Sequence, residues 1–275
     1  MPELPEVETI KEAMRKSVEG ASIESVTVFK RSLRLPVPPD FEEKITGKRI
    51  KRLYRIAKYV VMELCGGYSV VWHFGMSGKV TISHEVNPEL KKHDHVVIKT
   101  NRGIIIYNDP RRFGLVTLIK SDELYENPIF KSLGLDPFDE KLNKRYLIDK
   151  LKNKTVPIKV ALLDQTIISG IGNIYASEAL YEARISPLRQ SLSLTALETK
   201  RLIESVRHVL KKAIAAGGST LHDYRKPDGN IGYFQFQHAV YGKAGQKCPN
   251  CICKKGICHC IQAGRSTYYC KRLQK

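Results

Sequence analysis

The segment Pro2-Glu3-Leu4-Pro5-Glu6-Val7-Glu8-Thr9 combines a predicted helix start with a candidate reactive group. Pro5 suits the first position of a helix, and Glu6 favours the positive end of the helix dipole. Apolar residues then recur on one helical face, at Val7, Ile10, Met14 and Val18. This spacing predicts an amphipathic helix that packs against whatever sheet or helix follows.

The same segment carries a possible nucleophile. Methionine before proline is readily removed, which would leave a free secondary amine on Pro2 beside the carboxylate of Glu3. An α-amino group titrates near pH ~7.7–8.0, so roughly a tenth of it is neutral and nucleophilic at pH 7. Such an amine attacks an aldehyde carbon to give an iminium, which accepts electrons in later eliminations. From these residues alone, an ordinary helix start with a frayed terminus is the better interpretation.

Composition points to a folded protein with a polyanionic partner. The 275 residues are 42% hydrophobic, and 46 Lys and Arg against 28 Asp and Glu give a net charge of +18. Basic surfaces bind nucleic acid through counterion release, although an anionic membrane or no such partner are the alternatives. No segment approaches the ~18 apolar residues of a membrane span, and the acidic start is unlike a signal peptide. We expect a cytoplasmic protein without a membrane partner.

The pattern of apolar residues predicts an α+β fold. Runs rich in β-branched residues, which favour strands, lie at 23–29, 50–54, 59–64, 68–74, 79–83, 95–100, 104–107 and 115–119. We therefore expect an antiparallel β-sandwich carrying the terminal helix over residues 1–120. A linker at 121–140, a helical domain at 141–232 and a hairpin tail at 233–275 complete the predicted organisation.

The tail resembles a damaged zinc ribbon, which needs two Cys-x2-Cys knuckles. Cys248 and Cys251 form the first knuckle, but Cys270 is followed by Leu273 where the last cysteine is expected. We predict one Zn²⁺ per chain, held by Cys248, Cys251, Cys270 and an undetermined fourth donor. The further donors in the tail are Cys253, Cys258, His259 and Cys260. A zinc-free ribbon held by packing is the alternative, and Cys65 receives no role.

Two loops carry side chains that suit contact with DNA. In 74–78, Met76 is either core filler or an exposed wedge for a base stack. In 108–114, Arg111 and Phe113 lie on a Pro- and Gly-bounded turn that could read a base edge and stack. By their residue types alone, Lys58 is a solvated cation and His93 is as much a turn histidine as a ligand.

Several of these segments resemble the formamidopyrimidine-DNA glycosylases, bifunctional enzymes of base-excision repair. The resemblance rests on PELPEVET at 2–9, on the two loops, on ISGIGNIYASEAL at 168–180 and on the hairpin around 262–270. Leu4 distinguishes the start from the endonuclease VIII group, which typically has glycine there. The stretch 168–180 is similar to the second half of the family's helix–two-turns–helix motif, with Asn173 expected at the cap of a phosphate-binding helix.

The resemblance implies a role for each matching residue. Catalytic roles fall to Pro2, Glu3, Glu6, Lys58 and Arg265. DNA-binding roles fall to Met76, His93, Arg111, Phe113, Lys154, Asn173, Tyr241 and Arg265. Glu178 is expected to support the motif, and 217–224 is similar to a loop that covers the everted base. The usual glycine before the lysine is Ala57 in this chain.

The implied function is excision of oxidised purines from duplex DNA by base flipping, a Schiff base on Pro2 and β,δ-elimination. The expected partner is double-stranded DNA with an oxidised purine or an abasic site, bound by a monomer in a positive cleft between the domains. Three alternatives stay open: a relative that binds damaged DNA without cutting, a zinc-ribbon module without lesion specificity, and an enzyme of the endonuclease VIII type.

Overall fold

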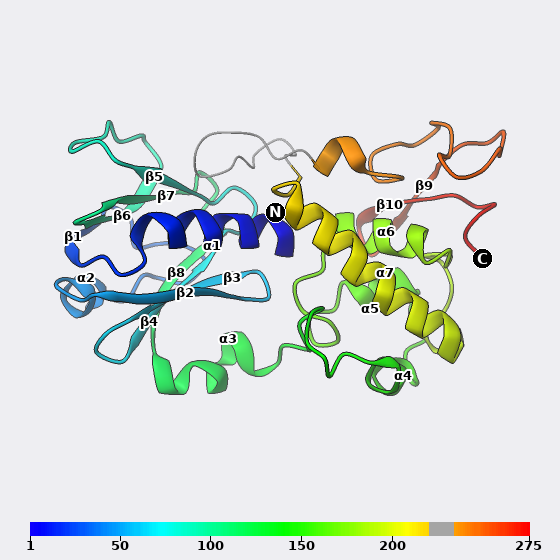
Figure 1. The fold of residues 1–275 in the computed structure, drawn as a ribbon, viewed down its shortest axis with the longest axis horizontal. Coiled ribbons are helices and arrows are strands. Elements are labelled where there is room, and N and C mark those ends of the chain that lie inside the picture. The colour runs from blue at the N-terminus through cyan, green and yellow to red at the C-terminus, as the bar shows by residue number, and fades with distance from the viewer. Residues whose placement is uncertain (220–233) are drawn as a thin grey trace. The chain divides into compact units, whose positions relative to one another are not determined.

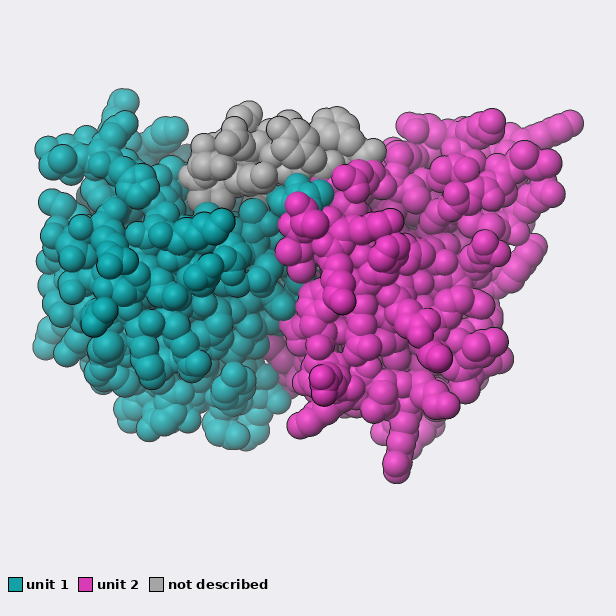
Figure 2. All heavy atoms as spheres, viewed as in Figure 1, with its two compact units in different colours: residues 1–131, 216–233 teal, residues 132–215, 234–275 magenta. Residues whose placement is uncertain are grey.

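A computed structural model describes residues 1–219 and 234–275 and divides the chain into two compact units (Figures 1 and 2). The first unit comprises residues 1–131 and 216–233, and the second comprises 132–215 and 234–275. Figure 2 shows the first in teal and the second in magenta. The first unit is built on strands and the second mainly on helices, which confirms the predicted α+β class.

The first unit contains two antiparallel sheets of four strands each. One has the order β1 (Ile23–Val28), β6 (Asp94–Thr100), β7 (Gly103–Asn108) and β5 (Lys79–Ser83). The other has the order β2 (Ile50–Ile56), β3 (Tyr59–Leu64), β4 (Tyr68–His73) and β8 (Leu115–Lys120). Every strand predicted from the apolar runs is present, with ends that differ by at most two residues. Tight turns at Gly66-Gly67 and at 101–102 join β3 to β4 and β6 to β7.

The helix α1 (Leu4–Val18) lies beside the strands of the first unit (Figure 1) and packs against both sheets. Its apolar face is buried. Val7, Met14 and Val18 are all fully buried in the core of this unit, with Trp72. Burial of each such side chain stabilises the fold by about 1.5–3 kcal/mol. The predicted amphipathic helix is therefore confirmed, and packing fixes its first turn in place.

In the described part of the first unit, three short helices were not predicted: α2 (Phe41–Ile45), the 3₁₀ helix η1 (Ser121–Glu126) and α3 (Pro128–Lys131). They carry too few residues for a periodic signal, and burial rather than propensity holds them. Phe41 and Ile45 are fully buried, and the ring of Phe130 lies 5.2 Å from that of Tyr59. Two of these helices occupy the first part of the stretch that we expected to be a linker.

The second unit contains the remaining elements. They are α4 (Lys144–Leu151), α5 (Ile158–Leu162), α6 (Asn173–Glu182), η2 (Ser191–Ser193), α7 (Ala196–Ala215), η3 (Phe234–Gln237), β9 (Cys258–Gln262) and β10 (Arg265–Tyr269). Helix α6 packs against α7 and against the hairpin β9–β10. Ala263 and Gly264 make the hairpin turn with φ of 45° and 71°, a left-handed conformation that glycine adopts freely. Among the described residues, no helix is long and apolar enough to cross a membrane.

Candidate catalytic and nucleic-acid-binding site

The start of α1 is fixed by a reciprocal pair of hydrogen bonds. The side chain of Glu3 accepts the backbone N–H of Glu6, and Glu6 Oε2 accepts the backbone N–H of Glu3 at 2.9 Å. The other oxygen of Glu6 accepts the N–H of Ser219 at 2.8 Å, within the same unit. Both carboxylates are buried, and Pro2 is buried beside them. The structure thus brings Pro2, Glu3 and Glu6 together and restrains the chain terminus through its backbone.

Lys58 lies in the turn between β2 and β3, and it is only 7% exposed. Burial argues against the solvated cation that its residue type suggested. Ala57, before it, has a φ of 51°, so the turn needs the left-handed conformation that glycine would adopt without strain. The departure from the usual glycine is therefore accommodated at some cost in backbone strain.

His73, at the end of β4, shares the surroundings of Lys58. Burial lowers the pKa of His73 to about 4, and the positive charges of Arg34, Lys58 and the chain terminus add to this shift. The ring is therefore neutral at pH 7, and its Nδ1 accepts the N–H of Gly75 at 3.2 Å. Arg34, Lys58 and the chain terminus therefore bring positive charge close to His73, and Asp109 is the negative charge that opposes their effect on its pKa.

The two loops with candidate wedge residues are held together by close backbone packing. A Cβ on Gly75 would lie 2.4 Å from the backbone of Phe113, so only glycine permits this approach. Met76 is 44% exposed and Phe113 is 51% exposed, and the guanidinium of Arg111 lies 4.9 Å from the Phe113 ring centroid. Met76 is therefore an exposed side chain and not core filler. The structure brings Met76, Arg111 and Phe113 to adjacent loops.

The buried carboxylate of Asp109, for which we predicted no role, organises both loops. One oxygen accepts the hydroxyl of Ser77 at 2.5 Å, and the other accepts the N–H of Gly114 at 2.8 Å. The phenol of Tyr107 donates to the same carboxylate at 3.3 Å, and burial together with Asp109 raises the pKa of Tyr107, which keeps the phenol protonated. Ser77 in turn accepts the N–H of Arg111 at 3.1 Å. Asp109 thereby links the Met76 loop to the Arg111 loop.

His93 lies near the same residues, and its carbonyl oxygen accepts the N–H of Asp109 at 3.0 Å. Its half-buried ring lies 6.2 Å from the ring of His95, whose Nε2 is 2.8 Å from the carbonyl oxygen of Asp109. His93 is therefore positioned by the loop that carries Arg111.

In the second unit, the start of α6 meets the hairpin. Asn173 Nδ2 donates to the carbonyl oxygen of Ser266 at 3.0 Å and to the hydroxyl of Tyr241 at 3.3 Å. The expected capping role of Asn173 is wrong: Gly172, in extended conformation, is the N-cap, and Asn173 is the first helical residue. Its amide reaches the hairpin instead of the helix N–H groups, so Asn173, Tyr241 and Ser266 form one cluster.

Two buried charged residues hold this cluster in position. Glu178, on α6, accepts the backbone N–H groups of Ala239, Val240 and Tyr241 at 2.7, 3.0 and 2.7 Å. Burial raises the pKa of Glu178 although these three hydrogen bonds lower it. Lys159, on α5, is fully buried and donates to Ser266 O at 2.9 Å and to Thr267 Oγ1 at 2.7 Å. The expected supporting role of Glu178 has a geometric basis in these contacts.

Arg265, Lys154 and the expected base-covering loop complete the predicted contacts. Arg265 is exposed at the first position of β10, directly after the hairpin turn. Lys154 Nζ forms an ion pair with Asp164 Oδ2 at 3.2 Å. The expected base-covering loop begins with Gly217, Gly218 and Ser219, and its positions from 220 onward lie outside the described residues.

The cysteines of the tail divide into two sets. The sulfur atoms of Cys248, Cys251, Cys253 and Cys270 all lie within 4.8 Å of one another and could hold a metal ion. Four thiolates in such a cluster match the donor set that zinc prefers in structural sites. Cys258 and Cys260 belong to β9 instead, and all seven cysteines are free thiols.

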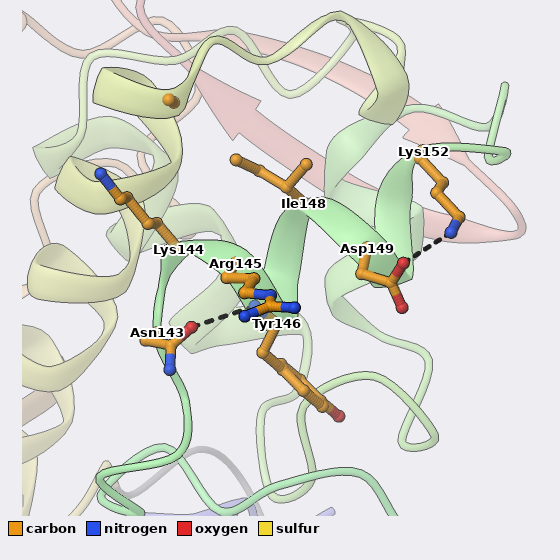
Figure 3. A pocket seen from close by; sticks show the side chains of 8 residues that line it. Asn143, Lys144, Arg145, Tyr146, Ile148, Asp149 and Lys152 are labelled. Atoms are coloured by element: carbon orange, nitrogen blue, oxygen red, sulfur yellow. Dashed lines mark hydrogen bonds and ion pairs between the residues drawn. The ribbon is translucent and has the colours of Figure 1, made fainter.

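A hollow of about 730 Å³ lies along α4 in the second unit (Figure 3). Its basic side chains include Lys144 and Arg145, whereas Asp149 and Lys152 are paired with each other at 2.6 Å. Of the described residues that line it, none is a residue predicted for catalysis or DNA binding. The candidate site therefore does not coincide with this hollow.

Both units of the chain match family models of known proteins. Residues 1–116 match the model of the formamidopyrimidine-DNA glycosylase N-terminal domain, and residues 133–225 match that of the formamidopyrimidine-DNA glycosylase H2TH domain. The chain belongs to the formamidopyrimidine-DNA glycosylase family. The predicted resemblance is thereby confirmed, and with it the predicted class of enzyme, a DNA glycosylase that repairs oxidised or abasic DNA.

Members of this family match the chain from end to end. Formamidopyrimidine-DNA glycosylases of Gluconobacter oxydans and Rhodospirillum rubrum are 43% and 42% identical, each over 100% of both chains. The structure of the Lactococcus lactis protein bound to DNA with an oxidised pyrimidine has a TM-score of 0.91, at 33% identity and full coverage of both chains. That of the Thermus thermophilus protein has a TM-score of 0.88, at 36% identity, and covers 99% of this chain and 98% of that one.

The sequence did not predict the buried residues that position the candidate site through hydrogen bonds to its loops. Asp109 and Lys159 were overlooked because they contact no predicted ligand and bind other parts of the chain. A signal for Lys159 exists, since it lies in the apolar run Ile158-Lys159-Val160-Ala161-Leu162, where a charged side chain must be buried or point away from the core. Asp109 carries no comparable signal, because an aspartate before a proline is common in turns.

Proposed function

We propose that this family member removes oxidised purines, such as 8-oxoguanine and formamidopyrimidines, from duplex DNA and then cleaves the strand at the resulting abasic site. The observation that carries the proposal is the restrained N-terminus. Pro2 is buried beside Glu3 and Glu6, and Glu6 accepts backbone N–H groups from Glu3 and Ser219. Fixed backbone contacts of this kind hold a terminal amine in a constant position for attack.

Removal of Met1 exposes the nucleophile. The Pro2 nitrogen then attacks C1′ of the damaged nucleoside, and the bond from C1′ to the base breaks with protonation of the leaving base. Glu3 donates a proton to the sugar ring oxygen and accepts it back around ring opening. The resulting iminium makes the neighbouring C2′ proton acidic. Its loss expels the 3′ phosphate, and a second elimination expels the 5′ phosphate.

Excision also requires that the damaged nucleotide be extruded from the duplex, and three exposed side chains of the first unit suit this step. Met76 would fill the vacated space, Arg111 would hydrogen-bond to the orphaned base, and Phe113 would wedge beside it. Each is exposed on a loop that Asp109 fixes to its neighbour. Insertion of such side chains offsets the few kcal/mol that unstacking costs.

Phosphate contacts would come from both units. Lys58 and His93 would serve in the first unit, and Lys154, Asn173, Tyr241 and Arg265 would serve in the second. The hydrogen bond from Asn173 to Tyr241 supports a joint role of these two residues at one phosphate. The net charge of +18 predicts that DNA affinity falls steeply with salt.

The tail would hold one zinc ion through Cys248, Cys251, Cys270 and a fourth donor. When bound, zinc would crosslink the segments of the tail and thereby support Arg265 in the neighbouring hairpin. We further propose that the enzyme is a cytoplasmic monomer.

Borohydride trapping tests the proposed chemistry. Purified protein is incubated with a duplex that carries one 8-oxoguanine opposite cytosine, and Pro2→Gly serves as the matched variant. We expect a covalent adduct in the wild type and at least about a hundredfold less adduct in the variant, which loses the secondary amine. Mass measurement establishes that the protein begins at Pro2.

Two outcomes would contradict the proposal. Absence of any adduct in protein that begins at Pro2 would favour a relative that binds damaged DNA without cutting. Stronger trapping on an oxidised pyrimidine would favour the endonuclease VIII type of specificity. The second substrate is included because the L. lactis relative was crystallised with DNA that contains an oxidised pyrimidine.

A further inference from the structure

The four-cysteine cluster includes a residue that a ribbon with two Cys-x2-Cys knuckles would not use. Cys248, Cys251 and Cys270 stand where such a ribbon has three of its ligands, and the fourth position holds Leu273. Leu273 packs against the cluster as an apolar neighbour. Cys253 completes the group of four, and its sulfur lies 3.6 Å from that of Cys270.

We infer that Cys253 is the fourth zinc ligand of this chain, in place of the cysteine that is missing at position 273. The inference rests on the zinc site of the proposed function and specifies its ligand set. The spacing becomes Cys-x2-Cys-x-Cys followed by a single distant cysteine, so three of four ligands come from one loop of six residues, 248–253. The second knuckle contributes only Cys270.

The distances between sulfur atoms favour metal ligation over disulfide bonds. Cys251 and Cys270 are 3.4 Å apart, and Cys253 and Cys270 are 3.6 Å apart. A disulfide joins its sulfur atoms at about 2.0 Å. Four thiolates around zinc at about 2.3 Å in a tetrahedron are separated by about 3.8 Å, which lies close to both observed values.

The backbone around Cys253 is shaped to bring it back to the cluster. Gly256 has a φ of 65°, and a Cβ there would lie 2.5 Å from the carbonyl oxygen of Gln246. The next residue, Ile257, donates to that same carbonyl oxygen at 2.8 Å and accepts the N–H of Gly245 at 2.8 Å. The chain therefore closes on itself directly after Cys253, and only glycine fits the closest point.

The two other cysteines of the tail are held away from this group by strand pairing. Cys258 is paired with Tyr269 and Cys260 with Thr267 across the hairpin. Neither belongs to the set of four sulfur atoms. They therefore serve as internal controls, because they are the same residue type in the same tail.

A tyrosine completes the surroundings of the metal site. The hydroxyl of Tyr181, near the end of α6, lies 3.2 Å from the sulfur of Cys248, where it can donate a hydrogen bond to a thiolate. Groups that hydrogen-bond to metal ligands orient them and raise metal affinity. The cluster thus connects the tail to the helix whose first residue is Asn173.

The experiment compares single substitutions of similar size in the full-length protein. Cys253→Ser is compared with Cys258→Ser and Cys260→Ser by zinc content and by competition with a chelator. We expect Cys253→Ser to weaken zinc binding by at least about a hundredfold, since even outer residues of metal sites contribute 10–100-fold. Both control variants should retain one equivalent. Adding Leu273→Cys to Cys253→Ser should restore binding, because it recreates the second knuckle.

Cobalt substitution reports the number of thiolates directly. In the cobalt-loaded wild type and controls, we expect the charge-transfer absorption of four thiolates, and in Cys253→Ser a loss of about a quarter of it. X-ray absorption of the zinc-loaded double variant Cys258→Ser/Cys260→Ser should still show four sulfur neighbours. This arm needs no change at Cys253, so it remains informative if Cys253→Ser fails to fold.

The outcomes separate this inference from the proposals on which it rests. Full zinc binding and an unchanged cobalt spectrum in Cys253→Ser would overturn the assignment of Cys253 alone. Loss of a sulfur neighbour in the double variant would also overturn it, in favour of Cys258 or Cys260. Absence of zinc from wild-type protein would overturn the zinc site altogether, while borohydride trapping on Pro2 would still test the glycosylase chemistry.

Discussion

Each unit of the molecule fixes its exposed functional loops with one buried carboxylate, but the two carboxylates bind different partners. In the first unit, Asp109 is fully buried and accepts a hydroxyl from Ser77, a phenol from Tyr107 and one backbone N–H from Gly114. In the second unit, Glu178 is 5% exposed and accepts three consecutive backbone N–H groups, those of 239–241.

The difference shows two ways to hold a loop from beneath. Hydroxyl donors can rotate toward water or toward another acceptor, so the partners of Asp109 lose only part of their hydrogen bonding when the carboxylate is removed. Backbone N–H groups have one fixed direction, so the three donors to Glu178 become buried and unsatisfied together. The sheet unit should therefore tolerate the loss of its carboxylate better than the helical unit.

The largest expected effect is at Glu178. Glu178→Ala should destabilise the second unit by about 3–5 kcal/mol, because it leaves buried donors without an acceptor. Glu178→Gln keeps one acceptor oxygen and should lose roughly half as much. Urea unfolding followed by a probe in the second unit measures both. An equal effect of the two substitutions would show that packing, not hydrogen bonding, is the role of Glu178.

At Asp109 we expect a smaller loss of stability and a larger loss of function. Asp109→Ala should cost about 2–3 kcal/mol, measured by thermal unfolding, because Ser77 and Tyr107 find other partners. The rate of lesion excision should fall by more than tenfold. Misplacement of the Met76 and Arg111 loops needs to raise the activation free energy by only about 1.4 kcal/mol to slow the reaction tenfold. Met76→Ala is the control, because it removes an exposed side chain and should melt like the wild type. Wild-type excision by Asp109→Ala would exclude a positioning role.

The smallest effect concerns pH and two buried histidines, one in each unit. Burial, with Arg34 and Lys58 nearby, lowers the pKa of His73 to about 4, and burial, with Lys243 nearby, lowers the pKa of His238 to about 4. An unfolded histidine titrates near 6.5, so between pH 6.5 and 4 the unfolded chain binds more protons than the folded one. The part of the folding stability that depends on these two histidines is therefore fully present above pH 6.5 and is lost as the pH falls toward 4.

Each histidine should account for about 2 kcal/mol of this loss at pH 5. His73→Asn, which can still accept the N–H of Gly75, should abolish only the pH-dependent loss of stability in the first unit. His238→Gln should abolish only the corresponding loss in the second unit. Chemical unfolding at pH 5 and pH 7.5 with a probe in each unit measures the shares. A pH dependence that neither substitution reduces would assign it to other groups.

The elements of the fold were largely predictable because they follow from local periodicity. Runs rich in β-branched residues located all eight strands that the structure describes in the first unit, and the spacing of Val7, Ile10 and Met14 located α1. Helix α2 could not be found in this way, because its five residues are helical only through the burial of Phe41 and Ile45. The cap of α6 was misassigned to Asn173 because a side chain that could cap the helix binds the hairpin instead.

The candidate site was predictable in its exposed members and not in its buried ones. Met76, Arg111 and Phe113 stand out in the sequence because their residue types and motifs suit contact with a ligand, and the structure leaves all three exposed. Asp109 and Lys159 act on residues of the chain itself, 32 positions away at Ser77 and 107 positions away at Ser266. Such partners are invisible to any local pattern, since contacts of high sequence separation exist only after folding.

The sequence by itself determined the family, the α+β class, the candidate nucleophile at Pro2, the basic charge and the cysteine-rich tail, because each depends on residue type and local order. Tertiary structure alone decided which cysteine joins the group of four, which loops share a carboxylate and which lysines are buried. Cys253, Cys258 and Cys260 are chemically the same residue in one short segment. Only the chain reversal at Gly256 and the pairing of β9 with β10 place the first beside Cys270 and hold the other two apart.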